Sequence, residues 1–195
     1  MTGSVRYTAL LWLLASTTIR AAAAPAIHYV ADPSKSSLEF QFTQAGALNK
    51  GRFGKFPVTF DFSTDTAAAD KLDVVVDMAS LDTGDKERDD TLRSADLFAV
   101  ANYPQARFTS TQVTKTATGY DALGRLTIRG VARDQHLTFK FRTTNEAGRS
   151  VGYLNGKVVI KRLEFGVGQG DWKSTEWVGD EVTVVYSVRL LPATP

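Results

Sequence analysis

The stretch with the most reactive side chains runs from Ser80 to Phe98 and reads SLDTGDKERDDTLRSADLF. It contains the triplet Asp82-Thr83-Gly84, which is the catalytic triplet of aspartic proteases. Their mechanism requires two such carboxylates that share one proton, and the triplet occurs once in this chain. A charged segment rather than an apolar strand follows it, so we interpret the triplet as a capped turn.

The same stretch carries five acidic side chains that could be considered as calcium ligands: Asp82, Asp85, Glu87, Asp89 and Asp90. Their spacing does not fit the twelve-residue calcium loop, which has a central glycine and a terminal glutamate. We therefore interpret them as a solvated acidic surface. We expect Arg88 and Asp89 to anchor the segment through charge-assisted hydrogen bonds.

Other chemical groups are sparse. The chain has two histidines, His28 and His136, and no cysteine, which excludes disulfides and thiolate metal sites. Two histidines far apart in sequence are not the pattern of a zinc site. The glycines of GVGQGDW precede no helical pattern, so they do not match a phosphate-binding fingerprint. The sequence predicts no catalytic residue, no metal site and no cofactor.

The N-terminal residues 1–24 have the pattern of a secretory signal peptide. Arg6 precedes the apolar run ALLWLLASTTI, and a row of alanines follows it. The run is shorter than the ~20 apolar residues of a membrane span, although an uncleaved anchor is the alternative. We expect cleavage after Ala24, or after Ala26, and a mature domain of residues 25–195 in the periplasm.

Charge gives no indication of a nucleic-acid partner. The whole chain has 23 Lys and Arg and 21 Asp and Glu side chains. Loss of Arg6 and Arg20 with the signal peptide leaves 21 of each, so the mature chain is formally neutral. Proteins that bind nucleic acid usually carry a basic patch, and none stands out here.

Most of the remaining sequence alternates apolar and polar residues, as strands with one buried face do. In SSLEFQFT, Leu38, Phe40 and Phe42 share one face, and Glu39 and Gln41 share the other. The alternation predicts strands at 56–62, 72–78, 137–141 and 182–190, with weaker candidates at 106–114, 120–129 and 150–163. Turn sequences such as ATGYD and NEAGRS separate some of them.

These patterns predict an all-β fold with about eight antiparallel strands in one domain. The spacing of Leu92, Ala95 and Phe98 predicts one or two helical turns from Asp85, so the charged stretch is a short helical crossover. The strands fit a sandwich or a closed barrel, and a barrel could be filled by its aromatic rings or enclose a ligand. Similar alternation occurs in outer-membrane barrels, whose apolar phase faces lipid.

Four motifs occur in order: GRFGKFPVTFDF at 51–62, SLDTGDKERDDTLRSADLFAVANYPQARFTST at 80–111, LGRLTIRGVARD at 123–134 and IKRLEFGVG at 160–168. Together they resemble the YceI-like family of exported lipid-binding proteins, over about residues 28–191. Members often have histidines where this chain has Lys35 and the Phe42–Gln44 segment, so no head-group contact or metal role is carried over.

The resemblance implies a single antiparallel, lipocalin-like barrel in the periplasm, without enzymatic activity. Its long apolar cavity would hold a polyisoprenoid or related long-chain lipid, such as a quinone or its precursor. The residues expected to line the cavity are Phe40, Phe42, Phe60, Val74, Val76, Phe108, Leu126, Ile128, Phe139, Phe141, Val158, Ile160 and Phe165.

The expected role is therefore that of a binding or carrier protein that contacts a membrane transiently. There are two alternatives. One is a structural or stress-protective envelope protein with a filled core, and the other is a lipid-processing enzyme. The sequence leaves open whether the protein forms a homodimer and whether it has a membrane redox partner.

Overall fold

The structure, a computed structural model, describes residues 26–63 and 70–193. The predicted signal peptide at 1–24 lies outside the described residues. Among the helices that are described, none has the length and apolar character needed to cross a membrane.

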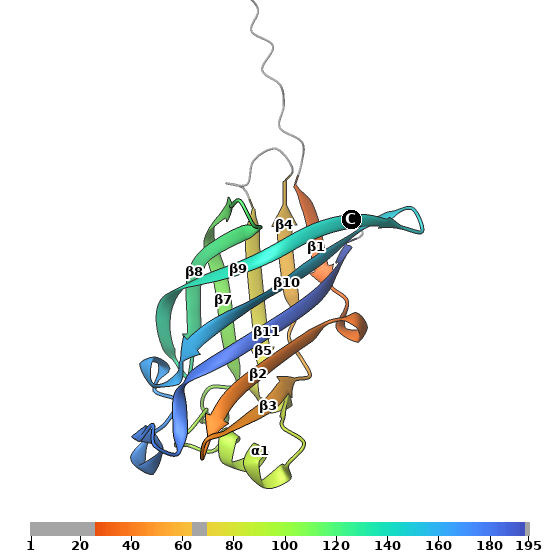
Figure 1. Cartoon of the computed structure of the whole chain (residues 1–195). Coiled ribbons are helices and arrows are strands. Elements are labelled where there is room, and N and C mark those ends of the chain that lie inside the picture. The colour runs from red at the N-terminus through yellow and green to blue at the C-terminus, as the bar shows by residue number, and fades with distance from the viewer. Residues whose placement is uncertain (1–25, 64–69, 194–195) are drawn as a thin grey trace, which may run out of the picture.

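Eight antiparallel strands close into a barrel (Figure 1), which confirms the predicted fold class. The ring closes because β11 pairs with β10 on one side and with β1 on the other, at Tyr29 opposite Pro192. In ring order the strands are β1 (Ile27–Ala31), β4 (Val58–Phe62), β5 (Lys71–Asp77), β7 (Gln105–Lys115), β8 (Tyr120–Ile128), β9 (Val131–Glu146), β10 (Arg149–Lys161) and β11 (Val178–Pro192).

Three further strands extend the sheet from the first half of β11. Because β1 is short, the first half of β11 pairs instead with β2, from Ser37 opposite Ser187 to Gln44 opposite Val178. The added strands are β2 (Ser37–Gln44), β3 (Ala47–Phe53) and the two-residue β6 (Leu81–Asp82), and the short 3-10 helices are η1 (Pro33–Lys35), η3 (Met78–Ser80), η4 (Arg162–Phe165) and η5 (Gly170–Lys173).

Strand pairing explains where the sequence pattern misjudged the strands. The alternation predicted a strand at 137–141, but β9 extends over Val131–Glu146. The first half of β9 pairs with β8 and the second half pairs with β10. These backbone hydrogen bonds keep β9 extended even where polar side chains lie on both faces of the strand. The predicted strand at 150–163 ends at Lys161, where η4 begins.

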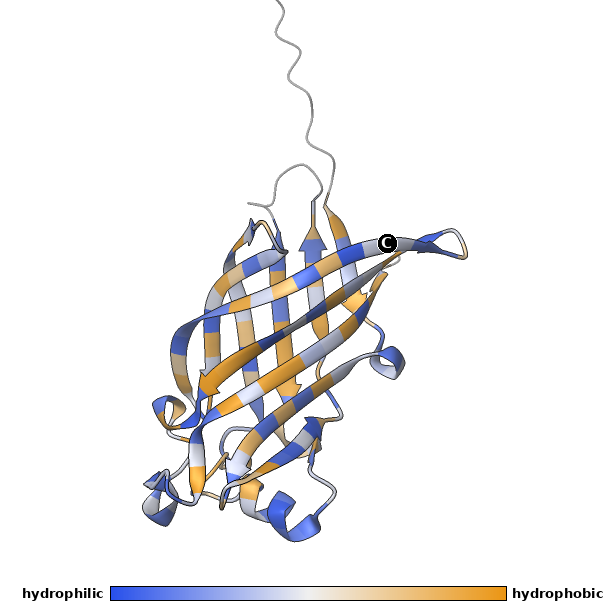
Figure 2. Cartoon of the chain, viewed as in Figure 1, coloured by the Kyte–Doolittle hydropathy of each residue, from blue (hydrophilic) through white to orange (hydrophobic). Residues whose placement is uncertain are grey.

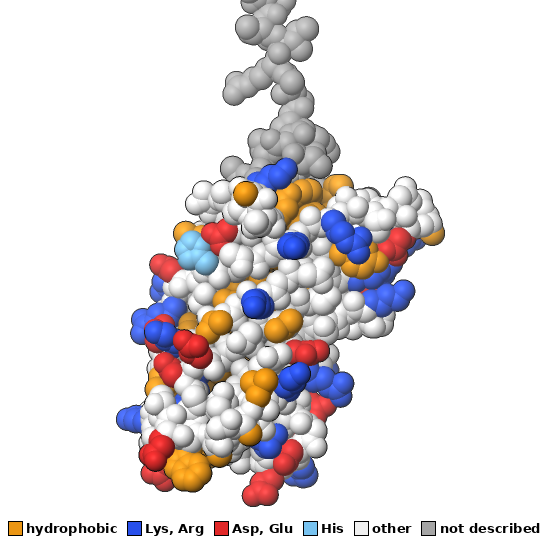
Figure 3. Space-filling model, in the orientation of Figure 1, with side chains coloured by type: hydrophobic (Ala, Val, Ile, Leu, Met, Phe, Trp, Pro, Cys, Tyr) orange, Lys and Arg blue, Asp and Glu red, His pale blue; other side chains and the backbone are white. Residues whose placement is uncertain are grey.

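The apolar phase of the strands points into the barrel and the polar phase points outward. Along β2, Leu38, Phe40 and Phe42 are buried while Glu39 is exposed. Figure 2 shows the resulting alternation of colours along most strands. The outer face in Figure 3 carries scattered charges of both signs. The inward-facing rings and aliphatic chains are therefore available to fill the interior or to line a space within it.

Aromatic rings fill the end of the barrel that lies far from helix α1. Ring centroids of Phe60 and Phe141 are 5.1 Å apart with planes at 89°, and those of Phe62 and Phe141 are 4.7 Å apart. Such tilted and edge-to-face contacts are favourable geometries for aromatic pairs. We call this cluster the aromatic plug, and its members are Tyr29, Phe60, Phe62, Tyr120, Phe139 and Phe141.

The predicted helical crossover exists at the opposite end and contains α1 (Lys86–Arg93). Asp85 caps the helix, since its carboxylate accepts the backbone N–H of Arg88 at 3.1 Å. The predicted spacing was wrong in one respect: the helix ends at Arg93, Ala95 is exposed, and Leu97 is buried instead. The chain turns after the helix, so the threefold spacing does not persist.

Hydrogen bonds hold the crossover against the barrel. The carboxylate of Asp89 is buried and accepts the backbone N–H of Thr83 at 2.8 Å and its hydroxyl at 2.7 Å. Arg129, in the β8–β9 turn, donates to the carbonyl of Ala95 at 2.8 Å. The expectation of an anchoring role therefore holds for Asp89. Arg88 differs, because its guanidinium makes no hydrogen bond within the part of the chain that is described.

An ion-pair network fastens the other end of the barrel. Arg189 on β11 donates to Asp32 and to Glu146, each at 2.6 Å. It thereby joins the segment after β1 to the tip of the β9–β10 hairpin. Hydrogen bonds from Ser34 and Arg189 hold the pKa of Asp32 below its usual value, and those from Tyr153 and Arg189 do the same for Glu146.

This network predicts a loss of stability in acid. A carboxylate whose pKa is lowered by folding contributes stability above its unfolded pKa, and this contribution is lost as the pH falls through the folded pKa. We expect the free energy of unfolding to decrease between about pH 5 and pH 3, and Arg189→Gln to lower it at neutral pH and flatten this decrease. Urea denaturation at several pH values measures both effects.

The matched control is Arg133→Gln, which removes an exposed arginine of β9. Its pH profile should be that of the wild type. Identical profiles for Arg189→Gln and wild type would show that the network does not contribute.

Candidate ligand-binding cavity

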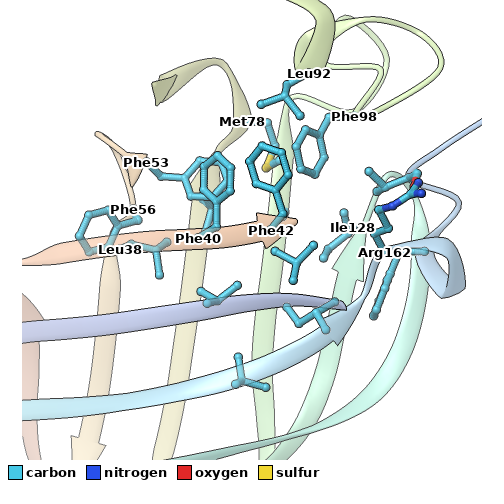
Figure 4. A pocket seen from close by; sticks show the side chains of 18 of the residues that line it. Leu38, Phe40, Phe42, Phe53, Phe56, Met78, Leu92, Phe98, Ile128 and Arg162 are labelled. Atoms are coloured by element: carbon cyan, nitrogen blue, oxygen red, sulfur yellow. The ribbon is translucent and has the colours of Figure 1, made fainter. Parts of the chain in front are cut away.

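A cavity of about 580 Å³ occupies the half of the barrel between the aromatic plug and α1. Its wall is mostly apolar, and Figure 4 shows Phe40 and Phe42 from β2 beside Leu92 and Phe98 from the crossover. The volume lies within the ~300–1,000 Å³ typical of small-molecule sites. The barrel is therefore not filled by its own side chains.

The structure places ten of the thirteen expected lining residues along this wall: Phe40, Phe42, Val74, Val76, Phe108, Leu126, Ile128, Val158, Ile160 and Phe165. The other three, Phe60, Phe139 and Phe141, belong to the aromatic plug and do not line the cavity. Twelve of the thirteen share the inward phase of their strands, and Phe165 lies in η4. The rings of the plug contact one another instead of enclosing space, and this is the physical reason for the difference.

Several lining residues were absent from the expected set. Leu38, Leu72 and Val184 lie on the inward faces of their strands. The same alternation identifies them when it is followed along the whole strand. Leu92, Phe98 and Trp172 come from the crossover and from η5, where no strand alternation exists. Tertiary packing alone brings these three to the wall.

Phe40 lies flat against the wall because the neighbouring strand has no side chain at the facing position. Phe40 pairs with Gly51 on β3, and a Cβ atom added at Gly51 would lie 2.3 Å from Cζ of Phe40. The ring also contacts Phe53, with centroids 5.1 Å apart. Gly51 therefore leaves the space that keeps the Phe40 ring out of the cavity.

Arg162 holds the loop that forms one side of the cavity mouth. It is 5% exposed, and its guanidinium donates five hydrogen bonds to backbone carbonyls. The acceptors are Gly179 (3.0 Å, from Nε), Val167 (2.9 Å) and Trp172 (2.8 Å, both from Nη1), and Ser174 (3.1 Å) and Val178 (2.9 Å, both from Nη2). Burial lowers the pKa of Arg162, and the charge of Asp180 opposes this effect.

The loop itself, residues 166–178, takes backbone conformations that suit glycine. Gly166 has φ = 68° and Gly168 has φ = 124°, both in the region that side chains disfavour. A Cβ atom at Gly168 would lie 2.1 Å from Nη1 of Arg162. The glycines of GVGQGDW therefore let the loop wrap closely around the guanidinium, which is a structural role.

The cavity opens beside α1. Among its lining residues, Asp85 and Glu87 are exposed, and Gln44, Arg88 and Trp172 are half-buried. The apolar wall therefore ends in a polar rim. This arrangement suits an amphiphile, whose tail can lie in the cavity while its polar end stays at the rim.

The two histidines and Asp82, which were considered for catalysis or metal binding, lie elsewhere. The His28 ring pairs with Asp61 across β1 and β4, and the His136 ring lies 2.8 Å from Asp121 across β8 and β9. Neither histidine lines the cavity. Asp82 binds Arg52 at 2.7 Å. Within residues 26–63 and 70–193, no three His, Cys, Asp or Glu side chains group to hold a metal ion.

Comparison with known proteins gives the family. A model of the YceI-like domain matches residues 29–190. The chain belongs to the YceI-like family. This confirms the resemblance seen in the motifs. A UPF0312 protein of Yersinia enterocolitica is 35% identical over 159 residues, which make up 78% of this chain and 79% of that protein.

Solved structures share the YceI-like barrel. Burkholderia cenocepacia BcnA has a TM-score of 0.75 at 33% identity, covering 84% of this chain and 99% of BcnA. A domain from Saccharophagus degradans, described as a polyisoprenoid binding domain implicated in plant cell wall breakdown, has a TM-score of 0.62 at 19% identity, covering 86% of this chain and 99% of the domain. At that identity the second likeness shows the fold alone.

We expect Arg162→Lys to destabilise the protein strongly. A lysine ammonium has three donors and cannot satisfy five carbonyls, and each buried group left unsatisfied costs about 1–3 kcal/mol. A loss of about 3 kcal/mol in the free energy of unfolding is expected by urea denaturation. Arg125→Lys, at an exposed arginine of β8, should change it little. Equal effects of the two variants would contradict the role assigned to Arg162.

We expect Gly51→Val to push the Phe40 ring into the cavity. Overpacking of this kind costs about 1–3 kcal/mol, and the displaced ring would reduce the space for a ligand. Urea denaturation and binding of the neutral fluorescent probe N-phenyl-1-naphthylamine measure the two effects. Lys50→Val, on the outward phase of β3, is the control. Wild-type probe binding by Gly51→Val would show that the ring does not border the space that the probe occupies.

Proposed function

We propose that the mature chain is a periplasmic binding or carrier protein for a polyisoprenoid or related long-chain lipid. The observation that carries this proposal is the cavity of about 580 Å³, which is apolar, closed by the aromatic plug and open beside α1. A quinone or its precursor is one ligand of this class. The carrier makes transient contact with a membrane when it takes up or releases its lipid.

The cavity favours a binding protein over a structural envelope protein with a filled core. A filled core would place the rings of Phe40, Phe42 and Phe165 against side chains across the barrel, whereas these rings border open space. Protein interiors are normally packed without large voids. A cavity of this size inside the barrel therefore supports the binding of a ligand.

The distribution of polar groups does not favour a lipid-processing enzyme. Catalysis by acid, base or nucleophile requires these groups within hydrogen-bond reach of one another and of the substrate. His28, His136 and Asp82 do not line the cavity, and they are engaged in ion pairs at separate places on the barrel.

The comparisons add support at the level of the family. The Saccharophagus degradans domain shares the fold and is described as binding a polyisoprenoid. The same architecture in this chain provides the corresponding interior. The ligand class is therefore proposed from the cavity of this chain together with that likeness.

Energetics are compatible with a carrier that exchanges its lipid. Each methylene removed from water contributes about 0.8 kcal/mol, so a tail of ~40 carbons would nominally exceed the ~18–21 kcal/mol at which affinities saturate. The bilayer offers an equally apolar environment, and ordering the tail costs entropy. The advantage of the cavity over the membrane must come from shape and from packing against aromatic rings, so exchange stays feasible.

Mass spectrometry tests the proposal. Protein isolated from the periplasmic fraction without detergent should begin at Pro25, or at Ile27 with the alternative cleavage, and should yield a near-stoichiometric long-chain lipid on extraction with organic solvent. We expect Ala106→Trp to abolish the bound lipid with the fold retained, because Ala106 lines the cavity on β7.

The control is Thr114→Trp, which places the same ring on the exposed face of β7. It should retain the lipid. The proposal fails if the wild type carries no lipid and added isoprenoids do not bind, and circular dichroism of Ala106→Trp separates loss of lipid from loss of the fold.

A further inference from the structure

Most polar side chains on the cavity wall are already bound to the protein. The Tyr186 hydroxyl donates to the carbonyl of Thr138 at 2.9 Å, and the Thr91 hydroxyl donates to the carbonyl of Glu87 at 2.8 Å. The guanidinium of Arg107 binds Asp73 at 2.8 and 3.0 Å. As described above, Arg162 uses its donors on backbone carbonyls. These groups have little left to offer a ligand.

Arg88 is different. Its side chain is 30% exposed and lines the cavity at the rim, yet its guanidinium makes no hydrogen bond among the residues that the structure describes. Its ion pair is a contact of 4.0 Å between Nη2 and the Oδ2 of Asp85. The amide of Gln44, on the rim with it, likewise makes no side-chain hydrogen bond in that part of the chain. The rim thus presents unused donors beside an apolar cavity.

We propose that Arg88 binds an anionic head group, a phosphate or a carboxylate, of an amphiphile whose tail lies in the cavity. The inference rests on the proposed function and narrows its ligand class. A guanidinium presents its donors in a planar fork that matches the two oxygens of such a group. Gln44 can add a hydrogen bond from its amide to the same acceptor oxygens.

The contact between Arg88 and Asp85 does not satisfy the guanidinium. Exposed ion pairs contribute little because solvent screens them, and the Asp85 side chain is 50% exposed. Its other oxygen, Oδ1, caps α1 by accepting the backbone N–H of Arg88. Asp85 and Glu87 also place negative charge at the rim, but Glu87 is exposed and screened by solvent. A ligand anion can therefore take the place of Asp85 beside the guanidinium.

Arg162 adds a second positive charge to the same wall. Among the described residues it forms no ion pair, and its bonds go to neutral carbonyls. A buried charge acts more strongly than an exposed one because less solvent screens it. Arg162 therefore favours an anionic over a cationic head through its field, which the charge of Asp180 weakens, while Arg88 supplies the direct contact.

The test compares ligands that differ only in the head group. Dissociation constants of farnesyl phosphate and farnesol are measured by displacement of N-phenyl-1-naphthylamine from the full mature protein, together with palmitate and hexadecanol. We expect the wild type to bind each anionic ligand about tenfold more tightly than its alcohol, since hydrogen bonds to charged groups contribute about this factor or more. Arg88→Gln should bring the ratio close to one and leave the alcohols bound as before.

The matched control is Lys86→Gln, which removes an exposed cation two residues away on the same helix that is paired with Asp90. It should keep the wild-type ratio, and Arg88→Lys should keep part of it. A ratio that falls equally in Arg88→Gln and Lys86→Gln would indicate general charge attraction and overturn the proposal. So would a wild-type ratio close to one.

Two further outcomes separate the sources of the effect. Millimolar inorganic phosphate should not displace farnesyl phosphate, because the tail supplies most of the affinity; displacement would overturn the proposal and indicate a site for free phosphate. Equal binding of farnesol and farnesyl phosphate would overturn the head-group assignment and leave the carrier proposal standing. Failure of every tailed ligand to displace the probe would instead overturn the carrier proposal.

Discussion

The open end of the barrel depends on one buried cation. The loop between η4 and β11 has no strand partner for most of its length, and carbonyls turned toward the interior need donors if they are not to destabilise the fold. Arg162 supplies these donors from a single planar group, to the five carbonyls between Val167 and Gly179. Phe165 and Trp172, which border the cavity, are held in place by the same loop. Without this arrangement, this side of the mouth would have no fixed wall.

The two ends of the barrel use aromatic side chains in opposite ways. At the far end, Phe60, Phe62 and Phe141 contact one another and leave no space between them. Near α1, the Phe40 ring lies over Gly51 and against the wall. The same residue type on the same inward phase thus closes one end and lines the other.

Period-two alternation predicted most of the strands and their inward phase, because it follows directly from the pleat of a strand. The barrel was predicted by the resemblance to the YceI-like family, since the alternation alone fitted a sandwich as well. The sequence could not separate Phe60 and Phe139 from Phe40, since whether a ring fills or borders space depends on partners remote in sequence. Likewise Arg88 and Asp89 are neighbours in one charged run, yet one faces the rim and the other is buried against Thr83. That difference follows from the direction of α1, which charge patterning does not encode.

The aromatic plug also determines the direction in which a bound lipid enters and leaves the cavity. A barrel open at both ends would let a molecule pass through it, but the aromatic plug closes one end of this barrel. The part of a ligand that enters last is therefore the part that leaves first. An amphiphile would therefore be released with its head leading and its orientation kept. In the proposed carrier role, the face that carries α1 would have to meet both the donor and the acceptor membrane, so the protein would rotate between them.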